Sequence, residues 1–232
     1  MSGWLGRVME ELIPSGAVPE DLGDWQRDQS GVYCPRCGAS AGKGSVMPAG
    51  CPFCLNQRLP WHRLTRLGLY APPVDAWVRQ MKFAGRWRFS EWFGQQLAEA
   101  MGEVTNPKRT LVCSVPMPLA RRWRRGYNQS DLLGRAVAAS RGWTYLPALK
   151  RTRYTPPQTS ITPSRRAENV RQSFAIDRVD LSGYEVMLVD DVKTSGTTLS
   201  ACCRLLTKAG ATGVHVGVIA VADPKGQAYQ YL

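Results

Sequence analysis

From about residue 70 onward, short apolar runs alternate with stretches in which apolar residues recur every three or four positions. The short runs are typical of buried strands, and the longer period is typical of helices that pack on one side. Strands that alternate with helices predict an α/β fold with a twisted, mainly parallel sheet. The pattern places helices over 90–101, 128–140 and 197–209, and strands over 110–115, 185–190 and 214–221, with a Pro-rich loop over 154–163 and a short helix over 163–171.

The first part of the chain has a different pattern. Residues 1–30 begin with a short amphipathic helix and continue as a polar, acidic stretch, whereas residues 31–65 are dense in Cys, Gly and Pro. A segment of that composition cannot build its own core and needs a staple. We therefore expect a helical lead-in over 1–30, a metal-binding module over 31–65 and an α/β domain over 66–232.

Four of the seven cysteines form two C-x-x-C pairs, Cys34 with Cys37 and Cys51 with Cys54. A two-residue gap lets one tight turn present two sulfurs to the same ion, and Gly38 follows the first pair, where such a turn needs a positive φ. Four thiolates complete a tetrahedral zinc site and leave no open position for water, so the pairs predict a structural zinc. The alternative is a set of buried or reactive thiols.

The remaining cysteines have a simpler interpretation. Cys113 falls within an apolar run, and Cys202 and Cys203 share helical spacing with Leu199 and Leu206. That spacing is typical of the core face of a helix, so we expect these three thiols to be buried in the core.

The composition of the 232-residue chain is ordinary, with 44% hydrophobic and 21% charged residues. No run approaches the ~18 apolar residues of a membrane-spanning helix. The N-terminus lacks the apolar core of a signal peptide. These features predict a cytoplasmic protein without a membrane span, in which the cysteines stay reduced.

The net charge of +12 is concentrated in one segment. Between Val104 and Ala167 there are thirteen Lys or Arg and one acid, Asp131, whereas the remainder of the chain carries seventeen residues of each sign. A field of one sign favours a polyanionic partner, which can be a phosphorylated ligand, a nucleic acid or both. A solvated basic face is the simpler alternative.

The strongest local motif is VMLVDDVKTSGTT over residues 186–198. A buried strand ends in Asp190 and Asp191, and the carboxyl ends of strands are where open α/β sheets bind ligands. Two adjacent carboxylates can accept hydrogen bonds from two vicinal hydroxyls or bind Mg²⁺. A phosphate-binding loop at the start of a helix follows, where backbone N–H groups attract anions. Its residues are Lys193, Thr194, Ser195, Gly196, Thr197 and Thr198.

Two alternatives to this motif are weaker. A helix that is only capped by Ser and Thr does not explain the two carboxylates beside the loop. A P-loop requires G-x-x-x-x-G-K-[ST], and that order is absent from this sequence. The motif therefore predicts a site for a ribose 5-phosphate group.

At these residues the chain resembles the type I phosphoribosyltransferase signature, and more specifically it is similar to the ComF family of competence-associated proteins. The double C-x-x-C is one shared feature. Other similar segments are Met81–Arg86, Val115–Pro118, Arg125–Ser130, Gln158, and Arg165 to Phe174 with Asn169 and Val170 between them. The resemblance covers roughly residues 31–222.

The resemblance implies a sheet of the phosphoribosyltransferase type that binds Mg²⁺ and phosphoribosyl pyrophosphate at its strand ends. Asp190 and Asp191 are expected to hold the ribose, Lys193–Thr198 the 5-phosphate, and the turn after Ser114–Pro116 to lie near the pyrophosphate. Ser195 stands where Thr is commoner, and it keeps a hydroxyl. The family link to DNA uptake implies uptake-machinery proteins as partners.

Three functions remain open from the sequence. The first is a transferase, which would stabilise a leaving pyrophosphate with Mg²⁺ and arginines. The candidate arginines are Arg124, Arg125, Arg153, Arg165 and Arg166. The sequence shows no element that recognises a base. A protein of DNA processing would bind single strands through Arg121, Arg122, Trp123, Arg124, Arg125 and Tyr127, which interleave cations with aromatic rings. The alternative for these arginines is a cluster around pyrophosphate with Trp123 packed beneath them. A regulatory sensor of phosphoribosyl pyrophosphate is the third function.

Overall fold

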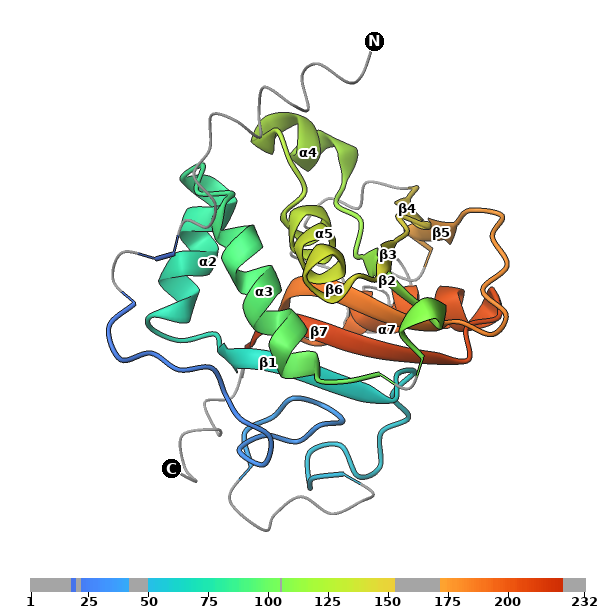
Figure 1. Cartoon of the computed structure of the whole chain (residues 1–232), viewed down its shortest axis with the longest axis horizontal. Coiled ribbons are helices and arrows are strands. Elements are labelled where there is room, and N and C mark those ends of the chain that lie inside the picture. Colours follow the sequence, from blue (N-terminus) through green and yellow to red (C-terminus); the bar gives the residue numbers. More distant parts are fainter. Residues whose placement is uncertain (1–17, 20–21, 42–49, 105, 153–171, 223–232) are drawn as a thin grey trace, which may run out of the picture.

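The computed structural model describes residues 18–19, 22–41, 50–104, 106–152 and 172–222. Figure 1 shows a central sheet with helices on both faces and the Cys-rich N-terminal segment beside one edge. Within the described residues, no helix is long and apolar enough to cross a bilayer.

The sheet has five parallel strands in the order β1-β7-β6-β2-β3. Parallel strands with both faces covered are buried throughout, which explains the continuous apolar runs of β6 and β7. The strand bounds are β1 Arg63–Leu69, β2 Thr110–Ser114, β3 Thr144–Tyr145, β6 Glu185–Lys193 and β7 Gly213–Val221. A separate two-stranded antiparallel sheet joins β4 Leu149–Arg151 to β5 Phe174–Ile176.

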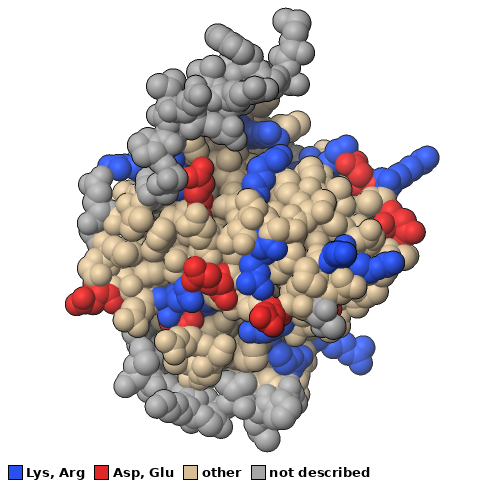
Figure 2. Space-filling model, in the orientation of Figure 1, with Lys and Arg blue, Asp and Glu red and all other residues tan. Residues whose placement is uncertain are grey.

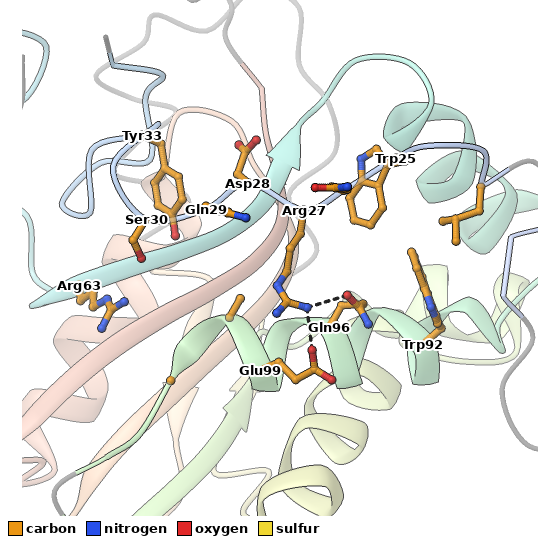
Figure 3. A pocket seen from close by; sticks show the side chains of 14 residues that line it. Trp25, Arg27, Asp28, Gln29, Ser30, Tyr33, Arg63, Trp92, Gln96 and Glu99 are labelled. Atoms are coloured by element: carbon orange, nitrogen blue, oxygen red, sulfur yellow. Dashed lines mark hydrogen bonds and ion pairs between the residues drawn. The ribbon is translucent and has the colours of Figure 1, made fainter. Parts of the chain in front are cut away.

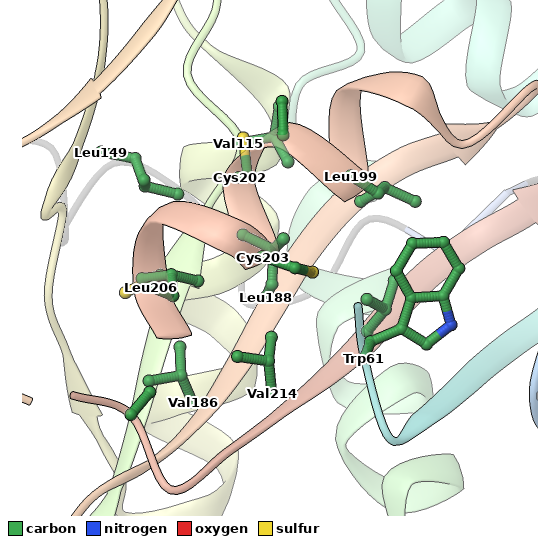
Figure 4. Close-up of a cluster of buried hydrophobic side chains, with 14 of the residues drawn as sticks. Trp61, Val115, Leu149, Val186, Leu188, Leu199, Cys202, Cys203, Leu206 and Val214 are labelled. Carbon is green, nitrogen blue, oxygen red and sulfur yellow. The ribbon is translucent and has the colours of Figure 1, made fainter. Parts of the chain in front are cut away.

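The helices divide between the two faces of the sheet. One buried cluster brings apolar residues of α2, α3 and α5 against one face, and a second brings α7 against the opposite face (Figure 1). On the α7 side, Leu199, Cys203 and Leu206 pack in one cluster with Val186, Leu188 and Val214, and Cys202 lies beside Val115 (Figure 4). The helix bounds are α2 Val74–Phe83, α3 Phe89–Met101, α4 Leu119–Arg125, α5 Gln129–Arg141 and α7 Thr197–Lys208, with a 3-10 turn over Pro107–Arg109.

The α3 and α5 helices approach each other closely at Gly94. A methyl group at this position would overlap Cβ of Ala136, so only a glycine permits this crossing. The contact fixes α5 against α3, and the first turn of α5 lies at the carboxyl ends of β2 and β6.

The six elements that the periodicity predicts are present, with bounds that differ by a few residues. The largest difference is β6, which continues to Lys193 instead of ending at Asp190, because β7 pairs with it through Lys193↔Val221. The core positions predicted for Cys113, Cys202 and Cys203 are confirmed, since all three are fully buried. The loop over 154–163, the helix over 163–171 and the N-terminal helix lie outside the described residues.

A buried arginine ties the N-terminal segment to the edge strand β1. Arg66 is only 2% exposed, and its guanidinium forms an ion pair with Asp28 at 2.7 Å. It also donates to the carbonyl of Gly38 (2.6 Å) and to the hydroxyl of Ser40 (2.9 Å), and it lies over the Tyr33 ring. These contacts hold the Cys-rich segment against the sheet.

Candidate functional site

The β2 and β6 strands are neighbours whose connections leave in opposite directions. The chain after β2 crosses one face of the sheet through α5, whereas the chain after β6 crosses the other face through α7. Such a reversal opens a crevice at the carboxyl ends of the two strands, where open α/β sheets bind ligands. Asp190 and Asp191 lie at this end of β6, as the sequence places them.

The two carboxylates are held by different partners. Asp190 Oδ1 accepts hydrogen bonds from the Ser130 hydroxyl (2.8 Å) and from the backbone N–H of Asp191 (2.9 Å). Asp191 Oδ1 pairs with the Lys82 ammonium at 2.9 Å, and its Oδ2 accepts from Gln129 Nε2 at 2.8 Å. Protein groups thus engage both oxygens of Asp191, whereas Oδ2 of Asp190 accepts no hydrogen bond within the described part of the chain.

Asp190 has a strongly perturbed acidity. Burial and the neighbouring Asp191 carboxylate raise the pKa of Asp190 to about 7, against the opposing effects of the Ser130 hydroxyl and the Lys82 charge. Asp190 therefore changes its protonation near neutral pH. A carboxyl with this property in a crevice at strand ends is typical of a functional site.

The loop after β6 has the form expected for anion binding. Gly196 is buried with a φ of 75° and is the N-terminal cap of α7, so only glycine fits this left-handed position without strain. Thr194 and Ser195 are exposed, and the hydroxyls of Ser195 and Thr197 lie 3.0 Å apart. Exposed hydroxyls thus lie at the start of a 12-residue helix, where the N–H groups have no carbonyl partner within the helix.

Lys193 differs from the rest of this loop, because its side chain is largely covered. Burial lowers the pKa of Lys193, and the thiols of Cys37 and Cys54 act in the opposite direction. The end of this side chain lies against the loop, since a Cβ at Gly196 would be 3.3 Å from Cε of Lys193.

The end of α2 meets the start of α5 at Asp191. Lys82 reaches Asp191 from α2, Tyr127 donates a hydrogen bond to the carbonyl of Met81, and the Arg125 guanidinium lies 4.9 Å from the centre of the Phe83 ring. Two segments that the ComF resemblance selects, Met81–Arg86 and Arg125–Ser130, are thus joined at one carboxylate.

Gln129 and Ser130 are site residues to which the sequence analysis gave no role. Both occupy the first turn of α5, and each binds one of the two carboxylates. Gln129 is 4% exposed, and its Oε1 is buried without a hydrogen bond in the described structure. A buried acceptor left unpaired costs about 1–3 kcal/mol. The available signal was their place at the start of the helix that the sequence predicts over 128–140, which follows the strand over 110–115.

A second polar network supports the end of β2. The hydroxyl of Ser114 donates to Asp131 Oδ1 at 2.6 Å, and the hydroxyl of Tyr145 donates to the same oxygen. Asp131, the single acid of the basic segment, therefore fastens the first turn of α5 to the ends of β2 and β3. Asn128 adds a bond from its Nδ2 to the carbonyl of Val115 at 3.2 Å, which fixes the turn that follows β2.

The α4 helix presents the basic and aromatic side chains to solvent. None of its seven residues is buried, Trp123 is 87% exposed, and Leu119 one turn earlier is 65% exposed. The alternative in which Trp123 packs beneath the arginines is therefore wrong for the described structure. Arg121, Arg122 and Arg124 are exposed, whereas Arg125 and Tyr127 turn toward α2.

On the face that Figure 2 shows, Lys and Arg alternate with Asp and Glu, so no continuous basic field covers that face. The described residues of the basic segment make contacts at different ends of the sheet. Arg109 lies over the Tyr184 ring near the start of β2, Arg141 donates to the carbonyl of Gly102, and Lys150 pairs with Asp177. Arg153, Arg165 and Arg166 lie outside the described residues.

The four cysteines of the two C-x-x-C pairs form a buried cluster that can hold a metal such as zinc. Their sulfurs lie within 4.8 Å of one another, with separations of 3.7 Å for Cys34–Cys54, 3.5 Å for Cys37–Cys51 and 3.9 Å for Cys51–Cys54. A tetrahedral zinc with Zn–S bonds of about 2.3 Å places its sulfurs about 3.8 Å apart. The donor set therefore fits this ion.

The thiols of the cluster differ in acidity. Burial raises the pKa of Cys34, but the backbone N–H groups of Cys37, Arg36 and Cys51 outweigh it and lower that pKa to about 7. Burial and the neighbouring thiolates raise the pKa of Cys37, and they raise that of Cys54 to about 11. A bound metal deprotonates its thiol ligands, and it would therefore overcome the raised pKa values of Cys37 and Cys54.

Trp61 connects the cysteine cluster with the phosphate-type loop. Its indole Nε1 donates to the carbonyl of Arg36 at 2.7 Å, between the two cysteines of the first pair. A Cβ at Gly196 would lie 3.5 Å from the Trp61 ring and 3.3 Å from Cε of Lys193. Figure 4 shows Trp61 beside Leu199, in the first turn of α7. The cysteine-rich segment thus forms one wall beside this loop.

A separate groove of about 680 Å³ lies away from this chemistry, between residues 22–33 and α3. Figure 3 shows Trp25 and Trp92 at one end and Arg63 with Tyr33 at the other. In its middle Arg27 donates to Gln96 (2.8 Å) and pairs with Glu99 (2.7 Å). Its central polar side chains are therefore already paired with one another.

Comparison with known proteins supports a phosphoribosyltransferase fold. The model of the phosphoribosyl transferase domain matches residues 148–230. DNA utilization protein YhgH of Escherichia coli (strain K12) is 34% identical over 196 residues, which cover 80% of this chain and 82% of that protein. Competence protein F of Haemophilus influenzae is 30% identical over 204 residues, which cover 82% and 85%.

Among solved structures, an adenine phosphoribosyltransferase is similar over 67% of this chain and 80% of its own, with 16% identity and a TM-score of 0.38. The family assignment rests on YhgH and competence protein F, which are similar to this chain over most of their length. Through them the chain belongs to the ComF family of phosphoribosyltransferase-like proteins, as its two C-x-x-C pairs and its VMLVDDVKTSGTT loop predict.

Proposed function

We propose that this chain binds phosphoribosyl pyrophosphate, or another nucleotide with a ribose 5-phosphate group, in the crevice between β2 and β6. The observation that supports the proposal is the order of three features from β6 into α7. A carboxylate with a raised pKa is followed by a buried left-handed glycine and a helix start with exposed hydroxyls. Asp190 and Asp191 then serve the ribose, and residues Lys193–Thr198 serve the 5-phosphate.

Magnesium fits this proposal at Asp190. Mg²⁺ is usually bound by one or two carboxylates together with substrate phosphates. Asp190 Oδ2 is the carboxylate oxygen of the pair that no described group engages. The ion would neutralise pyrophosphate when it is bound, while zinc in the cysteine cluster would have a structural role only.

Calorimetric titration tests the sugar-phosphate site. Phosphoribosyl pyrophosphate with MgCl₂ should bind the wild-type protein, and the double variant Asp190→Asn/Asp191→Asn should lose binding while it keeps its zinc. Asp177→Asn is the control, because this carboxylate pairs with Lys150 on the surface. Binding that survives in the double variant would overturn the assignment.

Pyrophosphate release across a panel of bases separates a binding protein from a transferase. Release with one base would favour the alternative function, an active phosphoribosyltransferase of nucleotide metabolism. Binding without release would favour a role in DNA processing, either by direct binding of DNA or as a sensor of phosphoribosyl pyrophosphate.

Single-stranded DNA is the proposed second ligand, and α4 is its proposed site. The supporting observation is the exposed ring of Trp123, which lies among Arg121, Arg122 and Arg124. The α4 helix that carries these side chains has no buried residue. Exposed rings can stack on bases, and the arginines can neutralise phosphates. The names of the relatives, which refer to DNA utilization and competence, support a role in DNA uptake with uptake-machinery proteins as partners.

Fluorescence anisotropy with a labelled oligonucleotide tests the DNA site. Trp123→Ala should weaken binding, whereas Leu119→Ala on the same face of α4 should not, because a leucine offers no ring for stacking. Each phosphate contact should contribute a slope of about −0.7 in log affinity against log salt. Affinity that ignores salt, or equal effects of the two variants, would argue against this site.

Different parts of the chain would have different roles. Residues 31–65 would act as a zinc module that supports the phosphate loop, and residues 66–232 as the phosphoribosyltransferase-like domain, in a cytoplasmic protein. Residues 1–30 would form the lead-in. Limited proteolysis with and without a chelator measures whether the first boundary behaves as a structural unit.

A further inference from the structure

The side-chain amide of Gln129 has one defined orientation. Its Nε2 donates to Asp191 Oδ2 at 2.8 Å, while the other oxygen of Asp191 pairs with Lys82. An ionised carboxylate only accepts hydrogen bonds, so the nitrogen of the amide must face Asp191. The carbonyl oxygen Oε1 therefore points away from Asp191, and it is buried without a partner in the part of the chain that the structure describes.

The chemistry of Oε1 restricts what can meet it. An amide oxygen is an acceptor, so its complement is an O–H or N–H group. Phosphate oxygens also accept, and a phosphate or pyrophosphate group therefore cannot satisfy this atom. The hydrogen bond from Nε2 to a charged acceptor polarises the amide and strengthens Oε1 as an acceptor.

The position of Gln129 selects a sugar hydroxyl as the donor. The next residue, Ser130, donates to Asp190, which is one of the two carboxylates that the proposed function assigns to ribose. Both side chains leave the first turn of α5 at the carboxyl end of β6. Two consecutive residues of one helical turn thus carry an unpaired acceptor and a bond to a proposed ligand carboxylate.

We propose that Gln129 Oε1 accepts a hydrogen bond from a hydroxyl of the bound sugar and so makes the site prefer ribose 5-phosphate over its deoxy analogues. The inference rests on the proposed ribose 5-phosphate site and adds its sugar specificity. Because Oε1 is covered, the neighbouring side chains must move apart before the sugar binds. Gln129 then acts as a specificity residue, and Lys82 and Asp191 position its amide.

Calorimetry with ribose 5-phosphate, 2-deoxyribose 5-phosphate and 3-deoxyribose 5-phosphate tests the inference. The wild-type protein should bind at least one deoxy sugar about tenfold or more weakly than ribose 5-phosphate, because a site built around a hydroxyl leaves a buried group unpaired without it. Gln129→Met keeps the length of the side chain but removes donor and acceptor. This variant should lose this tenfold preference and keep only the discrimination that Asp190 and Asp191 provide.

Gln96→Met is the matched control, since this glutamine lies on α3 and accepts from Arg27 in the separate groove. It should keep the wild-type preference. Zinc content and the unfolding midpoint verify that Gln129→Met is folded. If it is not, Gln129→Asn replaces it, because a side chain shorter by one methylene cannot reach both Asp191 and the sugar, and it should also lose the preference.

The possible outcomes separate this inference from the proposed function. Wild-type protein that binds none of the three sugars overturns the ribose 5-phosphate site and the inference with it. Wild-type protein that binds all three equally, or a folded Gln129 variant that retains the preference, overturns the role of Gln129 and leaves the site itself in place.

Discussion

Replacing Asp190 by asparagine is expected to stabilise the protein, and to do so more at pH 8 than at pH 5. Burial and Asp191 raise the pKa of the Asp190 carboxyl from 3.8 to about 7 in the folded protein. A carboxyl with a raised pKa holds its proton more tightly in the folded state than in the unfolded state. Its contribution to stability is therefore present below pH 4 and is lost as the pH rises to 7.

The magnitude follows from the shift. Each pKa unit corresponds to about 1.36 kcal/mol, so a shift of about three units gives an upper bound of about 4 kcal/mol at pH 8. About 2 kcal/mol of this develops between pH 5 and pH 7, because only the unfolded state is ionised over that range. Asp190 is partly exposed, and solvent reduces these values further. Asparagine cannot ionise, and it keeps an oxygen that can accept from Ser130.

Urea unfolding of the zinc-loaded protein at pH 5 and pH 8, followed by tryptophan fluorescence, measures the effect. The free energy of unfolding of Asp190→Asn minus that of the wild type should increase by about 1–2 kcal/mol from the lower to the higher pH. Contributions common to both proteins cancel in this difference, including that of His215, whose pKa is lowered by burial.

Asp177→Asn is the control for this experiment. Its carboxylate pairs with Lys150 on the surface, where the side chain is 45% exposed, and a surface ion pair contributes only about 0–1 kcal/mol. A difference for Asp190→Asn that is the same at both pH values would refute the raised pKa. If Asp190→Asn is more stable but no longer binds ligand, the Asp190 carboxylate lowers the stability of the protein and is needed for its function.

Three further predictions concern the scaffold. Arg66→Met should destabilise the protein by about 3–5 kcal/mol, since it leaves a carboxylate and a carbonyl without their buried partner, whereas the exposed Arg79→Met should change urea unfolding by less than about 0.5 kcal/mol. Gly94→Ala should cost about 1–3 kcal/mol through its overlap with Ala136, and Ala136→Gly in the same chain should restore most of the loss; failure of this rescue would contradict the close crossing. Cys34→Ser should reduce the zinc content measured by mass spectrometry and lower the melting temperature, and an unchanged, metal-free protein would contradict a structural metal site.

The sequence was most informative where one local signal agrees with its tertiary environment. The run over 186–189 is apolar and buried on both faces, and the left-handed Gly196 follows because a strand must turn directly into a helix. The C-x-x-C spacing likewise brings its sulfurs together through two short turns. In each case neighbouring residues specify the geometry, so the prediction needs little knowledge of the remainder of the chain.

The sequence was least informative where polar residues are buried by distant partners. The β1 strand was not predicted because Thr65, Arg66 and Gly68 interrupt its apolar residues. In the structure Arg66 is neutralised by Asp28, which is 38 residues away. The α4 helix escaped prediction for the opposite reason, since no side of it is buried and its sequence has no apolar period. Hydrophobic patterning detects only elements that bury one apolar face.

By itself the sequence determined the α/β class, the four-cysteine cluster, the acidic pair with its glycine loop, and the family. Only the tertiary structure decided how the two carboxylates differ, because Lys82 and Gln129 come from separate helices and engage Asp191 alone. It also distributed the basic segment over opposite ends of the sheet and exposed Trp123. Spacing along a chain fixes which groups are neighbours in one turn or strand, whereas burial, and with it pKa and the pairing of polar atoms, depends on what packs against them.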